Sequence, residues 1–131
     1  MLANPSRLYV LSSALRPEEA DLVHPAVVVR ALEALKLEYR YIVVDLGVAL
    51  TEATLTVLEQ ADDVAVVITP ELSTLKAFTQ VAKIMQDVLH VATGQIHLTI
   101  NHRAPHSSLS RQDVERLVDH PVVAEIRYLQ N

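Results

Sequence analysis

Short runs of apolar residues spaced along the chain are the clearest pattern in the sequence. Three of them, at 41–44, 64–68 and 96–100, are rich in β-branched residues and largely continuous. Such runs are typical of strands in a parallel sheet whose two faces are both covered. Two weaker runs lie at 8–11 and 122–126. The pattern therefore predicts five strands.

Apolar residues recur at helical spacing in the segments between these runs. The predicted helices span 25–37, 51–61, 73–92 and 110–118. Pro25 suits a first helical turn, and Thr51 is a candidate amino-terminal cap. Ser110 and Asp113 have the spacing of a capping box, and Pro121 blocks continuation of the last helix. Helices thus alternate with the predicted strands.

This alternation predicts an α/β fold, with a mostly parallel five-stranded sheet and helices on both faces, in the manner of a Rossmann-like three-layer sandwich. The length of 131 residues favours a single domain over 1–131. In such sheets, binding sites form at the carboxyl ends of the strands.

Composition narrows the function classes. The net charge is −5 and the basic residues form no block, so a nucleic-acid partner is not expected. The chain contains no cysteine, which excludes thiolate metal sites, disulfides and cysteine nucleophiles. No apolar run is long enough to span a membrane, so direct membrane insertion is not expected either. We expect a cytoplasmic protein.

Glycine is the most informative residue type, because the chain has only two, Gly47 and Gly94. Neither a G-x-x-x-x-G-K-[ST] loop nor a G-x-G-x-x-G loop can be written with them. These residues alone therefore supply no glycine-rich phosphate-binding loop.

The first candidate site follows the predicted strand at 41–44. Asp45 comes directly after that strand, and Gly47 follows two positions later. An aspartate at this place in a nucleotide hydrolase holds Mg²⁺, and a glycine lets the backbone approach a phosphate. The alternative is a loop aspartate that caps the helix beginning near Thr51, a common arrangement in α/β proteins.

Two further candidates follow the next strands. Thr69 and Pro70, with Glu71, end the strand at 64–68, and strand termination alone also explains them. Asn101 ends the strand at 96–100. Its amide offers a donor and an acceptor to a purine edge, or it closes a turn through its own side chain.

Other reactive side chains are scattered. The histidines at 90, 97, 102 and 106 raise the possibility of a metal site, but solvated loop histidines are the simpler interpretation. The serines at 12, 13, 107, 108 and 110 lack a nucleophile-elbow motif. Glu18, Glu19 and Asp21 form an acidic cluster that suits the solvated first turn of a helix.

Taken in order, these segments resemble one family. The stretches YRYIVVDLG at 39–47, LTEATL at 50–55, ADDV at 61–64 and VITPEL at 67–72 are similar to MinD/ParA-class (deviant Walker-A) ATPases. The likeness is greatest to the CpaE/TadZ group of pilus-assembly localisation proteins. Weaker matches at 8–11, 16–20, 109–114 and 124–126 extend the resemblance over nearly the whole chain.

The resemblance implies roles by position. Asp45 would be the Mg²⁺-proximal aspartate, Gly47 the adjacent switch glycine, and Asn101 the base-contacting residue, with Thr69 and Pro70 also in the nucleotide site. Family members dimerise around nucleotide and position other proteins. Their amino-terminal strand and lysine-bearing P-loop have no counterpart in these residues, and Val48 and Ala49 stand where the family has a proline-containing switch.

Three hypotheses follow. The first is a non-catalytic interaction or localisation module derived from such an ATPase, acting in pilus or secretion-system assembly. It needs no cofactor, and it forms a homo-oligomer, such as a dimer, or binds a partner protein through an exposed sheet edge. The second is a fragment of an active ATPase that binds Mg-ATP or Mg-ADP with a P-loop supplied upstream or by another chain. The third is an unrelated small α/β enzyme using the histidine-rich loop.

Overall fold

The computed structural model describes residues 2–3, 8–12, 24–105 and 107–129. Three of the features predicted above lie outside these residues: the acidic cluster of Glu18, Glu19 and Asp21, the hydroxyl of Ser13, and His106. The contacts divide the chain into two compact units, Met1–Val57 and Leu58–Asn131, and each is described by itself. The prediction of a single domain stays a prediction.

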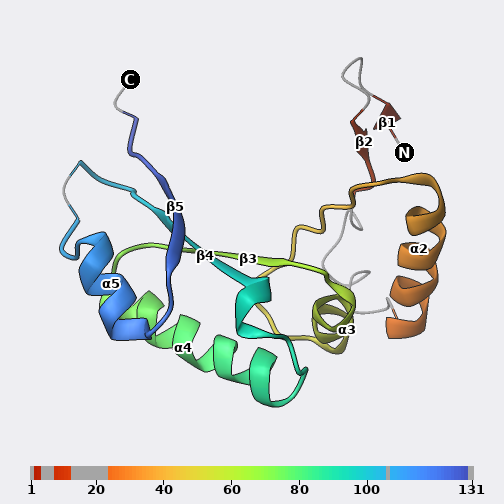
Figure 1. Ribbon diagram of the computed structural model, residues 1–131. Coiled ribbons are helices and arrows are strands. Elements are labelled where there is room, and N and C mark those ends of the chain that lie inside the picture. The colour runs from red at the N-terminus through yellow and green to blue at the C-terminus, as the bar shows by residue number, and fades with distance from the viewer. Residues whose placement is uncertain (1, 4–7, 13–23, 106, 130–131) are drawn as a thin grey trace. The chain divides into compact units, whose positions relative to one another are not determined.

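The amino-terminal unit combines a short β-ribbon with one long helix (Figure 1). Strands β1 (Leu2–Ala3) and β2 (Tyr9–Val10) pair antiparallel. Helix α2 (Pro25–Glu38) follows the prediction closely, with proline in its first turn and the Nδ1 of His24 accepting from the backbone N–H of Ala26 at 3.2 Å. The weak strand predicted at 8–11 is thus real, but it is short and its partner is antiparallel.

The run at 41–44 is not a strand, which corrects the strongest strand prediction in this unit. No described strand pairs with this run, and its side chains are largely exposed, with Tyr41 79% and Val43 94% accessible. An apolar run becomes a strand only when a neighbouring strand supplies hydrogen-bond partners, and that neighbour is not present in the described residues.

Helix α3 (Glu52–Gln60) follows this segment. Its first turn is capped by Thr51, whose hydroxyl accepts from the backbone N–H of Thr54 at 3.2 Å. The helix predicted at 51–61 is therefore confirmed, and Thr51 fills the capping position.

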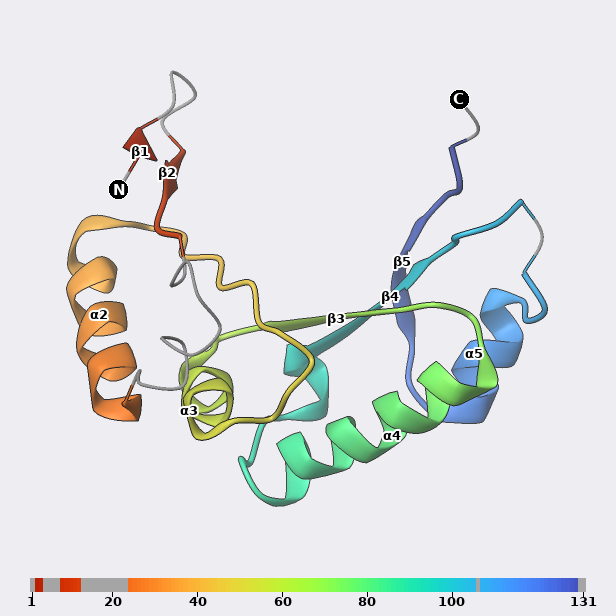
Figure 2. The ribbon, with the colours of Figure 1, turned by 180° about the vertical axis from the view of Figure 1, so that it is seen from behind.

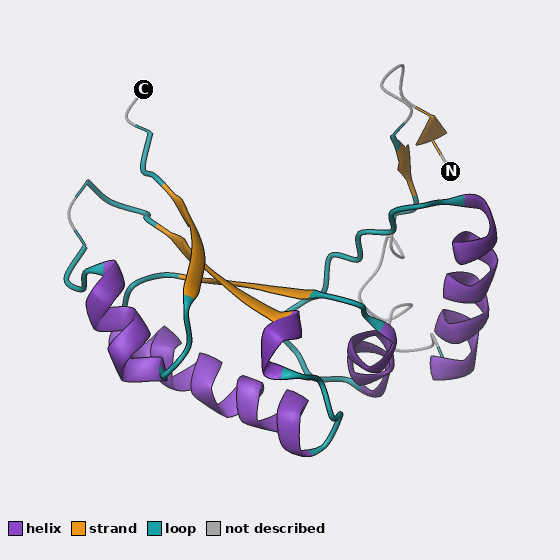
Figure 3. Ribbon diagram, viewed as in Figure 1, coloured by secondary structure: helices purple, strands orange, loops and turns teal. Residues whose placement is uncertain are grey.

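The carboxy-terminal unit is built on a parallel sheet of three strands in the order β3-β4-β5. The strands are β3 (Val64–Ile68), β4 (Ile96–Asn101) and β5 (Val122–Ile126). Three of the five predicted strands thus form the parallel sheet. Figure 3 shows them alternating with helices along the chain, as the sequence pattern predicts.

Two helices cover one face of this sheet, α4 (Leu72–Asp87) and α5 (Arg111–Val118) (Figures 1 and 2). The core lies between them and the strands, where Leu98, Ile100 and Val114 are fully buried and Met85 is 1% exposed. Alternate residues of β4 contribute to this core because successive side chains of a strand point to opposite faces.

The opposite face of the sheet is more open. Val67 on β3 and Val123 on β5 are 56% and 54% exposed, and the alternate residues of β4 on this face are only half-buried. Within the carboxy-terminal unit, the helices lie on one face of a three-stranded parallel sheet. The predicted five-stranded sheet with helices on both faces stays a prediction.

Helix α4 is shorter than the predicted span of 73–92. It ends because His90 adopts a left-handed conformation (φ 56°), and the N–H groups of Leu89 and Val91 turn back to the carbonyls of Ile84 and Met85. The 3₁₀ turn η1 (Thr93–Gln95) then leads into β4. Among the described helices, none is long and apolar enough to cross a membrane.

Candidate functional site

The carboxyl ends of β3 and β4 bring three of the predicted site residues to one edge of the sheet. Ile68 pairs with Ile100 in the parallel register, so the next residues, Thr69 and Asn101, leave neighbouring strands at the same level. Pro70 follows Thr69 directly. This edge is where α/β sheets place their ligands.

Hydrogen bonds to backbone carbonyls hold the turn after β3. The Thr74 hydroxyl donates to the carbonyls of Thr69 at 2.5 Å and Glu71 at 2.8 Å, and the N–H of Glu71 also donates to Thr69. Pro70 is buried, and the Ser108 hydroxyl donates to its carbonyl at 3.4 Å. The turn is therefore fixed both to α4 and to the loop after β4.

Asn101 is half-buried at the end of β4. Its backbone lies in register with Ile126, and the next residue, His102, donates its N–H to the carbonyl of Ile126 at 2.9 Å. No hydrogen bond joins the side-chain amide of Asn101 to any described residue. The turn-closing alternative is thus not seen, and a donor and an acceptor remain free at this edge.

A chain of charged side chains lies beside Asn101. His102 Nε2 is 2.9 Å from the carboxylate of Glu125, whose other oxygen is 3.9 Å from the guanidinium of Arg111. Arg111 also bonds the Glu115 carboxylate at 3.2 Å and the carbonyl of Val122. This network ties the end of β4, the start of α5 and strand β5 together.

Glu115 is the most strongly anchored member of the network. It accepts the backbone N–H of Val122 at 2.9 Å, and this bond, followed by the bond from Arg111, holds the pKa of its carboxyl below the ordinary value. The network could not be predicted from the sequence, because His102 and Glu125 are 23 positions apart and no local spacing marks such a pair.

The capping box predicted at the start of α5 is present. The Ser110 hydroxyl accepts from the N–H of Asp113 at 3.2 Å, and the Asp113 carboxylate accepts from the N–H of Ser110 at 3.1 Å. Hydrogen bonds from the Ser110 side chain and then its backbone lower the pKa of Asp113. The box fixes where the loop after β4 ends.

Asp45 and Gly47 belong to the amino-terminal unit, and the three residues grouped above belong to the carboxy-terminal unit. Both are exposed, and a Cβ added to Gly47 would meet no atom within 4 Å. The alternative role of Asp45 as a helix cap is not realised, because Thr51 caps α3. The proposed role of Asp45 near Mg²⁺ stays a prediction.

Three of the described histidines each have one hydrogen-bond partner that is distant in sequence. His97 Nε2 is 2.7 Å from Asp63, His102 bonds Glu125, and His120 Nε2 donates to the carbonyl of Ile96 at 2.8 Å. Within residues 2–3, 8–12, 24–105 and 107–129, no group of three or more His, Cys, Asp or Glu side chains is placed to hold a metal ion. The described histidines therefore give the metal-site hypothesis no ligand set.

Comparison with solved structures gives a match over most of the chain. The crystal structure of a ParA family ATPase from Chlorobium tepidum TLS matches with a TM-score of 0.77 and 25% sequence identity. The match covers 88% of this chain but 47% of the other, so this chain spans about half the length of the structure that it matches. No protein-family model and no curated protein matches the chain. The chain has a ParA/MinD-like fold.

Proposed function

We propose that this chain is a non-catalytic interaction or localisation module derived from a ParA/MinD-like ATPase. By its resemblance to CpaE/TadZ proteins, its setting is the assembly of a pilus or secretion system in the cytoplasm. It self-associates or binds a partner protein through a sheet edge, and it neither binds nucleic acid nor inserts into a membrane.

The outer edge of β3 is the observation that supports this proposal most. β3 pairs with β4 on one side, and no described strand pairs with it on the other. Its sequence VAVVI has no charge and no proline, and Val67 is 56% exposed. An unpaired apolar strand of this kind accepts a strand from another chain.

The other edge of the same sheet is protected. β5 is preceded by Pro121, carries Glu125, and its register with β4 is interrupted between Leu98 and Thr99. Proline, charge and an irregular register are the features by which natural edge strands avoid pairing. This contrast supports β3 as the edge that we propose for partner binding.

The predicted nucleotide-site residues are better suited to the base of a nucleotide than to its phosphates. The free amide of Asn101 suits a base, but a triphosphate needs a run of backbone N–H groups and a lysine in a glycine-rich loop. Gly47 and Gly94 are the only glycines, and neither has a positive φ. These residues alone therefore do not fit ATP, and we derive no hydrolytic step.

A matched pair of substitutions tests the edge. Val67→Lys places a charge beside the open edge of β3, and Val123→Lys makes the same change on β5, where the exposure is nearly equal. We expect self-association, measured by light scattering after size exclusion, to be lost in the first variant and retained in the second. Equal behaviour of the two variants, or a wild-type chain that stays monomeric and captures no partner, would contradict the proposal.

A second candidate is the half of an active ATPase whose P-loop comes from upstream or from another chain. The match to 47% of the ParA family structure favours it. Under this alternative Asp45, Gly47, Thr69, Pro70 and Asn101 hold Mg-ATP or Mg-ADP. Genomic sequence upstream of the Met1 codon discriminates, because an in-frame segment bearing G-K-[ST] would support this alternative.

A further inference from the structure

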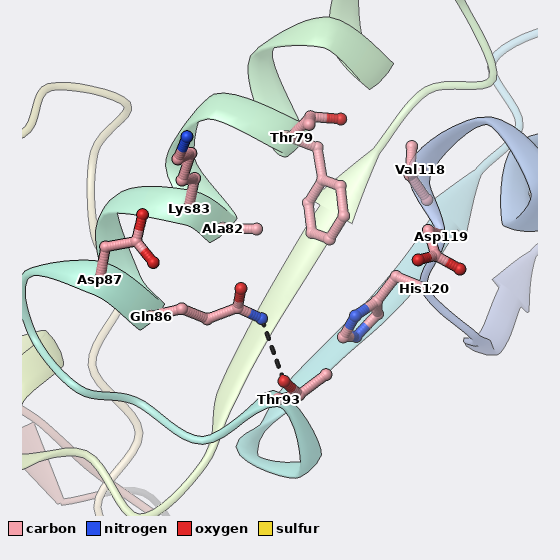
Figure 4. Close-up of a pocket in the computed structure, with 10 residues that line it drawn as sticks. Thr79, Ala82, Lys83, Gln86, Asp87, Thr93, Val118, Asp119 and His120 are labelled. Atoms are coloured by element: carbon pink, nitrogen blue, oxygen red, sulfur yellow. Dashed lines mark hydrogen bonds between the residues drawn. The ribbon is translucent and has the colours of Figure 1, made fainter.

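A pocket of about 440 Å³ lies at the end of the carboxy-terminal unit opposite Thr69 and Asn101. Its walls come from the last turns of α4, from Thr93 before β4, and from the turn at Val118–His120 before β5 (Figure 4). The hydrophobic side chains of Phe78, Ala82 and Val118 line it. None of the residues assigned above to nucleotide or partner binding belongs to it.

His120 gives the pocket a defined acceptor. The residue is only 5% exposed, and its ring lies edge-on to Phe78 with centroids 5.6 Å apart. Because a carbonyl can only accept, Nε2 must carry the hydrogen that bonds Ile96, and in the neutral ring Nδ1 is then an acceptor. Nδ1 bonds no described residue, and no fully buried side-chain nitrogen of the described residues lacks a partner, so Nδ1 is not completely buried.

The charges around the pocket favour a cation. Asp87 and Asp119 contribute two carboxylates, and Lys83 contributes one ammonium. The last residues of α4 and α5 also line the pocket. The last turn of α4 has no basic residue, whereas Arg116 in the last turn of α5 lies 3.9 Å from Asp113. Helix carboxyl ends carry partial negative charge, which adds to the preference for a cation over a phosphate or carboxylate ligand.

Figure 4 shows where polar groups lie in the pocket. Gln86 reaches across to Thr93, to whose hydroxyl its amide donates at 3.2 Å, and the ring of His120 lies beside this pair. Lys83 lies one turn before Gln86 on α4, and Asp87 follows Gln86 directly. The pocket thus combines an acceptor on His120, the charged side chains of Lys83 and Asp87, and an apolar surface.

We propose that this pocket binds an organic cation with N–H donors, such as an alkylguanidinium, whose N–H group bonds His120 Nδ1 and whose alkyl part packs against Ala82 and Val118. The chemistry is shared by a free small amine and by an arginine side chain of a protein. The site is independent of the β3 edge and of any nucleotide.

The test is a titration of the full chain followed by ¹H–¹⁵N NMR, with n-butylguanidinium as one probe and an acetyl-Ala-Arg-Ala-amide peptide as the other. We expect saturable shifts at the amides of Thr93 and His120. Tighter binding of the small guanidinium indicates a free small molecule as the ligand, and tighter binding of the peptide indicates an arginine side chain of a protein. Butyltrimethylammonium has the same charge but no N–H donor, so we expect it to bind at least about tenfold more weakly.

Two substitutions that change the charge of the pocket in opposite directions complete the test. We expect Asp87→Asn to weaken n-butylguanidinium binding and Lys83→Gln to strengthen it, each by about two- to fivefold, the range for exposed charge pairs. Asp62→Asn, an exposed carboxylate outside the pocket, is the matched control and should change nothing. Urea unfolding midpoints verify that each variant is folded.

Several results would overturn the inference: no saturable shift with either probe, shifts centred elsewhere, equal affinity for butyltrimethylammonium, or Asp87→Asn and Lys83→Gln acting in the same direction.

Discussion

Replacing Leu98 with alanine should remove a large part of the stability of the carboxy-terminal unit. Leu98 is fully buried in the central strand, where it pairs in register with Val66 on β3 and Val122 on β5. Both edge strands therefore pair with β4 at Leu98. Leucine-to-alanine changes at such sites cost about 3–5 kcal/mol, because the lost transfer energy adds to the cost of a cavity.

Urea unfolding measures this loss. For a unit of this size, about 3 kcal/mol also lowers the melting temperature by about 12–24 °C. The matched control is Leu117→Ala on α5, where the side chain is 55% exposed and we expect a change within about 0.5 kcal/mol. Similar losses in the two variants would refute the assignment of the core to the space between the sheet and its two helices.

Three further predictions concern two ionised carboxylates, the cap of α3 and the side-chain amide of Asn101. Acidification should destabilise the chain as the pH falls through the lowered carboxyl pKa values of Glu115 and Asp113, since these groups stabilise the fold only when ionised. Glu115→Gln should flatten the low-pH end of a melting-temperature profile, and an unchanged profile would contradict the role of the Val122 bond. Thr51→Ala should cost about 1 kcal/mol in urea unfolding by removing the cap of α3, whereas Ser12→Ala, a change outside any helix, should be neutral. Asn101→Ala should leave the melting temperature within a few degrees of wild type, because its amide bonds no described residue, and a large drop would reveal a structural role.

The sequence predicted the carboxy-terminal unit well. The runs at 64–68, 96–100 and 122–126 became β3, β4 and β5, and the capping box of Ser110 and Asp113 marks the start of α5. These features are local, and each depends on periodicity or on a fixed spacing that a single segment contains.

Two of the misses are features that depend on distant partners. The run at 41–44 has the composition of a strand but no paired neighbour among the described residues. The early end of α4 is a local feature instead, because the left-handed conformation falls on His90 and no glycine marks it in the sequence. The link between His102 and Glu125 joins residues 23 positions apart. Thr69 and Asn101 were correctly expected at one sheet edge, because parallel strands bring their carboxyl ends together.

Isothermal titration of the chain with Mg-ATP tests the central claim most directly. Because its sequence contains neither glycine-rich phosphate-binding motif, we expect the chain to release or absorb no saturable heat at millimolar nucleotide. Micromolar binding that disappears in Asp45→Ala would contradict the account, since it would show that these residues hold a triphosphate by themselves.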